Sequence, residues 1–259
     1  MLIALTRGVS PTIGACELNY LPRQSIDLEK AIEQQRNYER FMSEKGVKVI
    51  SLPVQPDLPD AVFVEDTAIV VDEVAVIVTT GAASRRREVE TVAETLYSYY
   101  PLEFVRLPGT VEGGDVIRIG RTVYAGVSRR TNLEGVNQLR EILKRYDYEV
   151  VPLRVHGCLH LTTACSYLGR ETILVNREWM DCDGFAGFDL IDVPATEPWA
   201  ANTVKLNGIN LVSSSFPQTV ELLEGRGFKP YALDLSELEK AEAGPSCLSL
   251  LFETKDQND

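Results

Sequence analysis

The stretch "TAIVVDEVAVIVTT", residues 67–80, has the pattern of two short strands joined by an acidic turn. It is followed by "SRRREVETVAETLYSYY", residues 84–100, whose apolar residues recur at helical spacing. "LEFVRLP", residues 102–108, then predicts a third strand. The order strand, strand, helix, strand makes one supersecondary unit, and the rest of the chain repeats it.

Two later segments show the same order. One consists of a hairpin that turns at Gly120-Arg121, a helix and a strand: "DVIRIGRTVYAGVS", "TNLEGVNQLREILKRY" and "YEVVPLRV". The other consists of "TVKLNGINLVSS", "PQTVELLEGRG" and "KPYALDL". Its hairpin turns at Asn207-Gly208, a dipeptide that strongly favours such turns.

The remaining sequence supplies two further units. "TACSYLGRETILVN" predicts a hairpin, and "REWMDCDGFAGFDLIDV" after it contains only a weak helix. "DLEKAIEQQRNYERFMSEKG" predicts an amphipathic helix before the strand "VKVISLP". The end strands "LIALTR" and "CLSLLFE" can complete one unit together.

A repeat of about 45 to 50 residues indicates units that stack on one another. The sequence therefore predicts an α/β fold of five repeats closed into a ring. We expect a single domain over residues 1–259, with the last few residues as a disordered tail.

Composition limits the function. A net charge of -12 disfavours binding to nucleic acids and anionic membranes, so a small or cationic partner is favoured. The five cysteines lack C-x-x-C spacing and indicate reduced thiols, which fits the cytoplasm. We expect no signal peptide, because Arg7 interrupts the short apolar stretch near residue 1, and no run approaches the roughly 20 apolar residues of a membrane span.

Reactive residue types stand at equivalent places in the repeats, where the first strand of each unit opens. These are Glu65-Asp66, Glu112, His160, Asn202 and Cys247, at intervals of about 42 to 48 residues. In a closed ring, equivalent positions meet around the central axis. Carboxylates, a histidine and a thiol are therefore expected to face one another.

In content and order, six segments of the chain resemble the dimethylarginine dimethylaminohydrolases of the pentein superfamily. The segments are "LPDAVFVEDTA", "GAASRRREV", "VEGGDV", "SRRTN", "LHL" and "SCLSLLFE". The resemblance implies a pentein-type α/β propeller of five ββαβ repeats with pseudo-fivefold symmetry. It also implies hydrolysis of asymmetric dimethylarginine or monomethylarginine to citrulline and dimethylamine or methylamine, with no metal or organic cofactor.

The resemblance also implies a role for ten residues. The expected nucleophile is Cys247, the acid and base is His160, and the third catalytic group is Glu112. Asp66 and Glu112 would hold the guanidinium, with Asp60 and Glu65 completing the binding region. Arg85 and Arg130 would bind the α-carboxylate, and the backbone of Leu18 and Ala241 would line the amino-acid end.

The chemistry of the residues agrees with these roles. A guanidinium carbon is a poor electrophile, so its hydrolysis needs a strong nucleophile and a proton for the departing amine. Cys247 would attack to form a thiouronium intermediate, while His160 would protonate the amine and later deprotonate a water molecule. Although a lone cysteine in an apolar run is more often structural, the position of Cys247 in the repeat favours the nucleophile.

Two arginine clusters, "SRRREVE" and "SRRTNLEG", begin predicted helices, with Ser84 and either Thr131 or Asn132 as N-caps. Cations in a first helical turn oppose the helix dipole unless they bind an anion there. A substrate carboxylate would be that anion. Arg86, Arg87 and Arg129 remain consistent with a solvated basic face.

Three alternatives are open. "HGCLH" spaces His156 and His160 as a zinc pair would be, although Gly157 argues against the helix that such a pair needs. An arginine deiminase-like enzyme would act on free arginine, but Thr162 stands where those enzymes have an aspartate. A noncatalytic propeller that binds a partner would need no reactive residues at its axis.

The chain departs from the family at Thr162-Thr163, where Lys-Ser is common, and at Pro245-Ser246, where Leu-Thr is common. These departures bear on substrate preference more than on the chemistry. The sequence does not decide between methylated and free arginine. It also leaves the oligomeric state open, including a homodimer.

Overall fold

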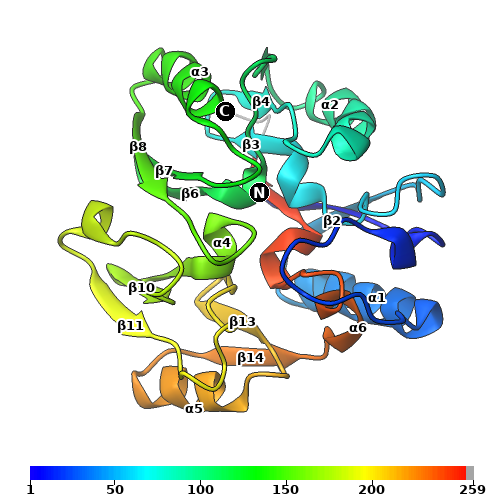
Figure 1. The fold of residues 1–259 in the computed structure, drawn as a ribbon, viewed down its shortest axis with the longest axis vertical. Helices are drawn as coiled ribbons and strands as arrows, with labels where there is room; N and C mark the ends of the chain where they lie inside the picture. The colour runs from blue at the N-terminus through cyan, green and yellow to red at the C-terminus, as the bar shows by residue number, and fades with distance from the viewer. Residues whose placement is uncertain (255–259) are drawn as a thin grey trace.

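The computed structural model describes residues 1–254 and arranges them as five three-stranded sheets around a central axis (Figure 1). The expected five ββαβ repeats of an α/β propeller are confirmed. The tail expected at the C-terminus falls on residues 255–259, outside the described residues.

The strands, given sheet by sheet, are β15 (Leu250–Glu253), β1 (Leu2–Arg7) and β2 (Lys48–Leu52); β3 (Ala68–Val70), β4 (Ala75–Ile77) and β5 (Leu102–Phe104); β6 (Val116–Ile119), β7 (Thr122–Val127) and β8 (Glu149–Arg154); β9 (Cys165–Gly169), β10 (Thr172–Val175) and β11 (Asp189–Asp192); β12 (Val204–Leu206), β13 (Ile209–Ser213) and β14 (Pro230–Leu233).

The helices and short 3-10 turns are η1 (Ile13–Ala15), α1 (Leu28–Glu44), η2 (Val64–Thr67), η3 (Ala83–Glu88), α2 (Val89–Leu96), η4 (Gly113–Asp115), α3 (Leu133–Lys144), α4 (Leu161–Ala164), η5 (Asp183–Phe185), α5 (Pro217–Gly225), α6 (Ser236–Glu239) and η6 (Pro245–Leu248).

Within each sheet, the first two strands pair antiparallel and the third pairs parallel to the second. The parallel step needs a crossover, which the chain makes along the outside of the ring. The hairpins at Gly120-Arg121 and Asn207-Gly208 are confirmed. Asn207 and Gly208 have φ angles of 46° and 79°, as a two-residue hairpin turn of this kind requires.

The ring is closed by the two ends of the described chain. Strand β1 pairs antiparallel with β15, with Leu2 opposite Glu253 and Leu5 opposite Leu250. The amide N–H of Thr254 also donates to the carbonyl of Met1, at 2.9 Å. The expectation that the two end strands complete one unit is therefore confirmed.

Two local expectations need correction. Ser84 is not a helix cap, because η3 begins at Ala83 and the Ser84 hydroxyl donates to Glu17 instead. The weak helix expected in residues 177–193 is only the turn η5, since Gly184 and Gly187 give that stretch little helical propensity. By contrast, Asn132 does cap α3, accepting from the N–H of Gly135 at 2.7 Å.

Short helical turns, absent from the sequence prediction, precede four of the first strands. They are η2, η4, α4 and η6, and the axis residues lie in them or at their N-caps. Cys247 therefore lies in η6 rather than in a strand, contrary to the pattern of its apolar run. These turns direct the side chains of different units toward one another at one end of the axis.

The core is divided into clusters, most of which lie between a sheet and a helix that covers it. Around α3, for example, Leu139 and Leu143 pack with Val123 and Val150 of β7 and β8. Among residues 1–254, no helix combines the length and the apolar character that crossing a membrane would need.

We expect Leu139→Ala to lower the free energy of unfolding by about 2 to 5 kcal/mol, because Leu139 is fully buried and its truncation leaves a cavity. Leu133→Ala is the matched control, since Leu133 lies on the same helix and is 60% exposed. Its effect should stay within about 0.5 kcal/mol. Urea unfolding followed by circular dichroism measures both, and equal losses would contradict this packing.

Candidate active site

Glu112 and His160 form the central contact at the axis. Oε2 of Glu112 lies 2.7 Å from Nε2 of His160. Oε1 accepts from the N–H groups of Gly81 and Ala82, at 3.0 and 3.3 Å, and lies 3.4 Å from Nη1 of Arg130. Burial opposes a charge on Glu112, but the bond to His160 and nearby cations lower its pKa below the ordinary value. This carboxylate is therefore ionised.

His160 keeps a proton in this environment. Its burial disfavours the charged form, yet Asp66, whose Oδ1 lies 3.7 Å from Nδ1, and the bond to Glu112 outweigh burial. Together with Asp115 they raise the pKa of His160 to about 9. A buried imidazolium can donate a proton to a departing amine at neutral pH.

Asp66 and Arg85 form a buried ion pair, with Oδ2 and Nη1 2.7 Å apart. Arg85 also donates to Glu88 through Nη2 and Nε, and its Nη2 donates to the carbonyl of Phe63 at 3.2 Å. The sequence placed Arg85 and Asp66 at opposite ends of the substrate. In the structure these two side chains contact each other, and Arg85 neutralises the charges of both Asp66 and Glu88.

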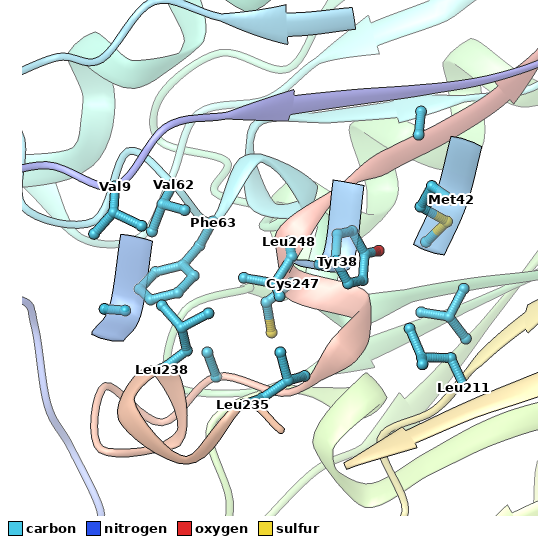
Figure 2. Packing of buried hydrophobic residues seen from close by; sticks show 14 of the residues in the cluster. Val9, Tyr38, Met42, Val62, Phe63, Leu211, Leu235, Leu238, Cys247 and Leu248 are labelled. Carbon is cyan, nitrogen blue, oxygen red and sulfur yellow. The ribbon is translucent and has the colours of Figure 1, made fainter. Parts of the chain in front are cut away.

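Cys247 lies in an apolar environment and is 7% exposed. It belongs to a cluster that includes Phe63, Leu235 and Leu248, and Figure 2 shows its sulfur among these side chains. The N–H of Gly244 donates to Sγ at 3.4 Å. Burial, reinforced by nearby carboxylates, raises the pKa of the Cys247 thiol well above its ordinary value. The resting thiol is therefore protonated.

Glu65 lies close to both reactive groups. Its Oε2 accepts from the hydroxyl of Ser246 at 2.8 Å. Burial and the charge of Asp66 raise the pKa of Glu65 to about 8, against the lowering effects of Ser246, His160 and Cys247. Glu65 and Ser246 also line a cavity of about 360 Å³ at the axis.

Comparison with known proteins identifies the family. The family model described as "N,N dimethylarginine dimethylhydrolase, eukaryotic" matches residues 19–207. The chain belongs to this family. It is 36% identical to the N(G),N(G)-dimethylarginine dimethylaminohydrolase of Pseudomonas aeruginosa, over 87% of this chain and 90% of that one. It is 35% identical to the Streptomyces coelicolor protein of the same name, over 95% of each chain.

Solved structures agree with the family assignment. A mutant of the Pseudomonas aeruginosa dimethylarginine dimethylaminohydrolase, complexed with citrulline, matches with a TM-score of 0.91. It is 32% identical, and the match covers 96% of this chain and 98% of that one. The N-terminal domain of the cyanobacterial arginine dihydrolase ArgZ shares the fold, with a TM-score of 0.83 at 21% identity and 97% and 98% of the two chains covered.

The other residues that the family resemblance assigned to substrate binding lie around one loop, close to the apolar cluster that contains Cys247. Leu18 packs against the same apolar cluster as Ala241 and Cys247. Asp60 is buried, and both of its carboxylate oxygens lie 3.1 Å from the N–H of Glu17. Asp60 therefore anchors the loop that carries Leu18.

Glu242 anchors the next part of this loop, and sequence reasoning missed it. One carboxylate oxygen, Oε1, accepts from the N–H groups of Asn19, Tyr20 and Leu21, at 2.9, 2.5 and 2.7 Å. Its φ angle of 62° is rare for a residue other than glycine. Nothing in "KAEAG" distinguishes this glutamate from a surface one, so no sequence signal could have found it.

Asp115 and Glu88 were also missed, although the sequence holds a weak signal for Glu88. Asp115 is fully buried and accepts from the N–H of Leu161, at 2.9 Å, and from the hydroxyl of Ser128. It thus holds the turn that follows His160. Glu88 stands three residues after Arg85, the spacing at which opposite charges meet on a helical turn.

We expect Glu112→Gln to lower the pKa of His160 by about 1 or more, because the imidazolium loses its ionised partner. NMR titration of the two histidines measures this, and His156→Gln assigns the signals. Glu141→Gln is the control, since it removes the same charge from an exposed site. A His160 signal that titrates alike in all variants would contradict the Glu112 contact.

Proposed function

We propose that the protein hydrolyses N-omega-methylated arginine to citrulline and dimethylamine or methylamine. The relatives named as dimethylarginine dimethylaminohydrolases, and the related structure complexed with citrulline, support this substrate class. The observation that carries the proposal is the buried pair of Glu112 and charged His160, with Asp66 beside the histidine and Glu65 near both the histidine and the Cys247 thiol. This group of residues suits a substrate that is itself a cation.

The first step is activation of the thiol by the substrate. A guanidinium beside Asp66 and Glu65 lowers the pKa of Cys247, because positive charge favours the thiolate. The thiol releases its proton to solvent, and the resulting thiolate attacks the guanidinium carbon. His160 donates its proton to the methylated nitrogen, the carbon–nitrogen bond breaks, and the amine leaves. The product of this step is a thiouronium bonded to Cys247.

The second step regenerates the enzyme. His160, now neutral, takes a proton from a water molecule whose oxygen attacks the thiouronium carbon. The carbon–sulfur bond breaks, and the oxygen-bound proton of the product passes to the thiolate sulfur. Citrulline leaves as a neutral urea, and the resting thiol and imidazolium return. Glu112 orients His160 and stabilises its charge in both steps, with its own position maintained by the N–H groups of Gly81 and Ala82.

We assign the amino-acid end of the substrate to residues around Glu112, His160 and Cys247. We assign the α-carboxylate to Arg130, with Arg85 as part of the same charged cluster. The backbone of Leu18 and Ala241, together with Asp60, lines the α-amino end. The five cysteines are free thiols, which supports our proposal that the protein acts in the cytoplasm.

Cys247→Ser should abolish turnover of dimethylarginine and monomethylarginine, because a serine hydroxyl is far less acidic than a thiol. The change in volume is small, so the melting temperature should change little. Citrulline and amine release measure activity, and free arginine serves as a third substrate. Activity of Cys247→Ser near that of the parent would contradict the nucleophile. No turnover of any guanidino compound by the parent would instead favour a binding protein.

Treatment with EDTA should leave the activity unchanged. Asp66, Glu112 and His160 offer atoms within 4.8 Å of one another, which a metal ion could bind. These atoms already contact one another and the guanidinium groups of Arg85 and Arg130, so the charges are balanced by protein groups. His156 is exposed, and its backbone N–H donates to the carbonyl of Trp179. If EDTA abolished the activity and added zinc restored it, the result would support a metal enzyme.

A further inference from the structure

Asn202 occupies the fifth axis position, but the proposed chemistry gives it no part. It lies just before β12 and is 5% exposed. Its side chain makes two hydrogen bonds, both to Ser246, the residue before Cys247. The N–H of Ser246 donates to Oδ1 at 2.9 Å, and Nδ2 donates to the Ser246 hydroxyl at 2.9 Å.

The direction of these bonds is fixed by their donors. A backbone N–H can only donate, so the atom of Asn202 facing it must be the amide oxygen. The amide nitrogen then faces the Ser246 hydroxyl and must donate to it. The single hydroxyl proton of Ser246 is left for Oε2 of Glu65, at 2.8 Å. The side-chain hydrogen bonds therefore run from the Asn202 amide through the Ser246 hydroxyl to Glu65, while the backbone N–H of Ser246 donates back to Asn202.

Asn202 also packs against the N-cap residue of the turn that carries the thiol. A Cβ atom placed on Gly244 would lie 2.4 Å from Cγ of Asn202. Gly244 accepts from the N–H of Cys247 at 3.2 Å and donates to its Sγ at 3.4 Å. One buried amide thus contacts both Gly244 and Ser246, which flank Pro245 at the start of the turn.

We propose that Asn202 is a positioning residue that sets the place and the electrostatic environment of the Cys247 thiol through Ser246. The inference rests on the proposed function, in which Cys247 is the nucleophile. A 3-10 turn of four residues has little stability of its own. Because attack on the guanidinium carbon requires accurate alignment, a small displacement of this turn slows the reaction far more than it weakens binding.

Asn202→Ala should lower kcat by about 10- to 100-fold, with KM within about threefold of the parent. Asn210→Ala is the matched control, because Asn210 is a buried asparagine of the same unit, 2% exposed, whose side chain donates to Leu168 instead. It should lose stability without a comparable loss of kcat. Equal kcat losses in the two variants would overturn the inference.

A double-mutant cycle tests whether the effect passes through Ser246. The loss of kcat in Asn202→Ala combined with Ser246→Ala should be at least about fivefold smaller than the product of the two single losses. Losses that multiply would mean that Asn202 acts independently of Ser246, which contradicts the proposal.

Alkylation of Cys247 by iodoacetamide provides a readout that needs no turnover. Mass spectrometry of the peptide that contains Cys247 gives its rate as a function of pH. Asn202→Asp keeps the shape but adds a negative charge beside the turn, so the apparent pKa of alkylation should rise by about 1. An unchanged pKa would contradict the proposal that Asn202 sets the electrostatic environment of the Cys247 thiol. If the parent released no citrulline, the proposed function would fail, while this measurement would still test the position of Asn202.

Discussion

The hydrogen bond between Glu112 and His160 is the contact on which the candidate active site depends. Neither group is stable alone in a buried position, because an isolated charge there carries a large desolvation penalty. Together, with the N–H groups of Gly81 and Ala82 on the second carboxylate oxygen, they form a charged pair whose hydrogen bonds are satisfied. The histidine is thereby kept protonated, which is the state that a leaving amine requires.

Charge compensation extends outward from this pair. Asp66 is paired with Arg85, and Arg85 is paired in turn with Glu88. The positive charge of Arg85 therefore offsets the repulsion between these two carboxylates. Within the described chain, Glu65 makes no ion pair, and burial together with the charge of Asp66 raises its pKa. A guanidinium that arrives beside Glu65 and Asp66 would complete the compensation. It would also lower the pKa of the thiol, so binding and activation of the nucleophile are the same electrostatic event.

The ring makes this arrangement possible because it brings together residues from separate units. Glu112, His160 and Cys247 lie in three different repeats, and each is presented by a short helical turn before a first strand. Pairing of β1 with β15 closes the ring, so the turn that carries Cys247 is supported by both ends of the chain. The loop that carries Leu18 is attached from two sides, by Asp60 and by Glu242.

The local sequence by itself determined the repeated units, because strand alternation, helical spacing and turn dipeptides such as Asn207-Gly208 act over a few residues. It also marked the axis residues, since closure of a repeat places equivalent positions together. Resemblance to the family added their expected roles. Several features depended on contacts between residues far apart in the chain, and these only the tertiary structure decided. They include the pairing of Arg85 with Asp66, the anchoring of the loop by Glu242, and the bonds from Asn202 to Ser246. The tertiary structure also decided the protonation states of His160 and Cys247, because burial and neighbouring charges set them. No sequence pattern records burial or the neighbouring charges.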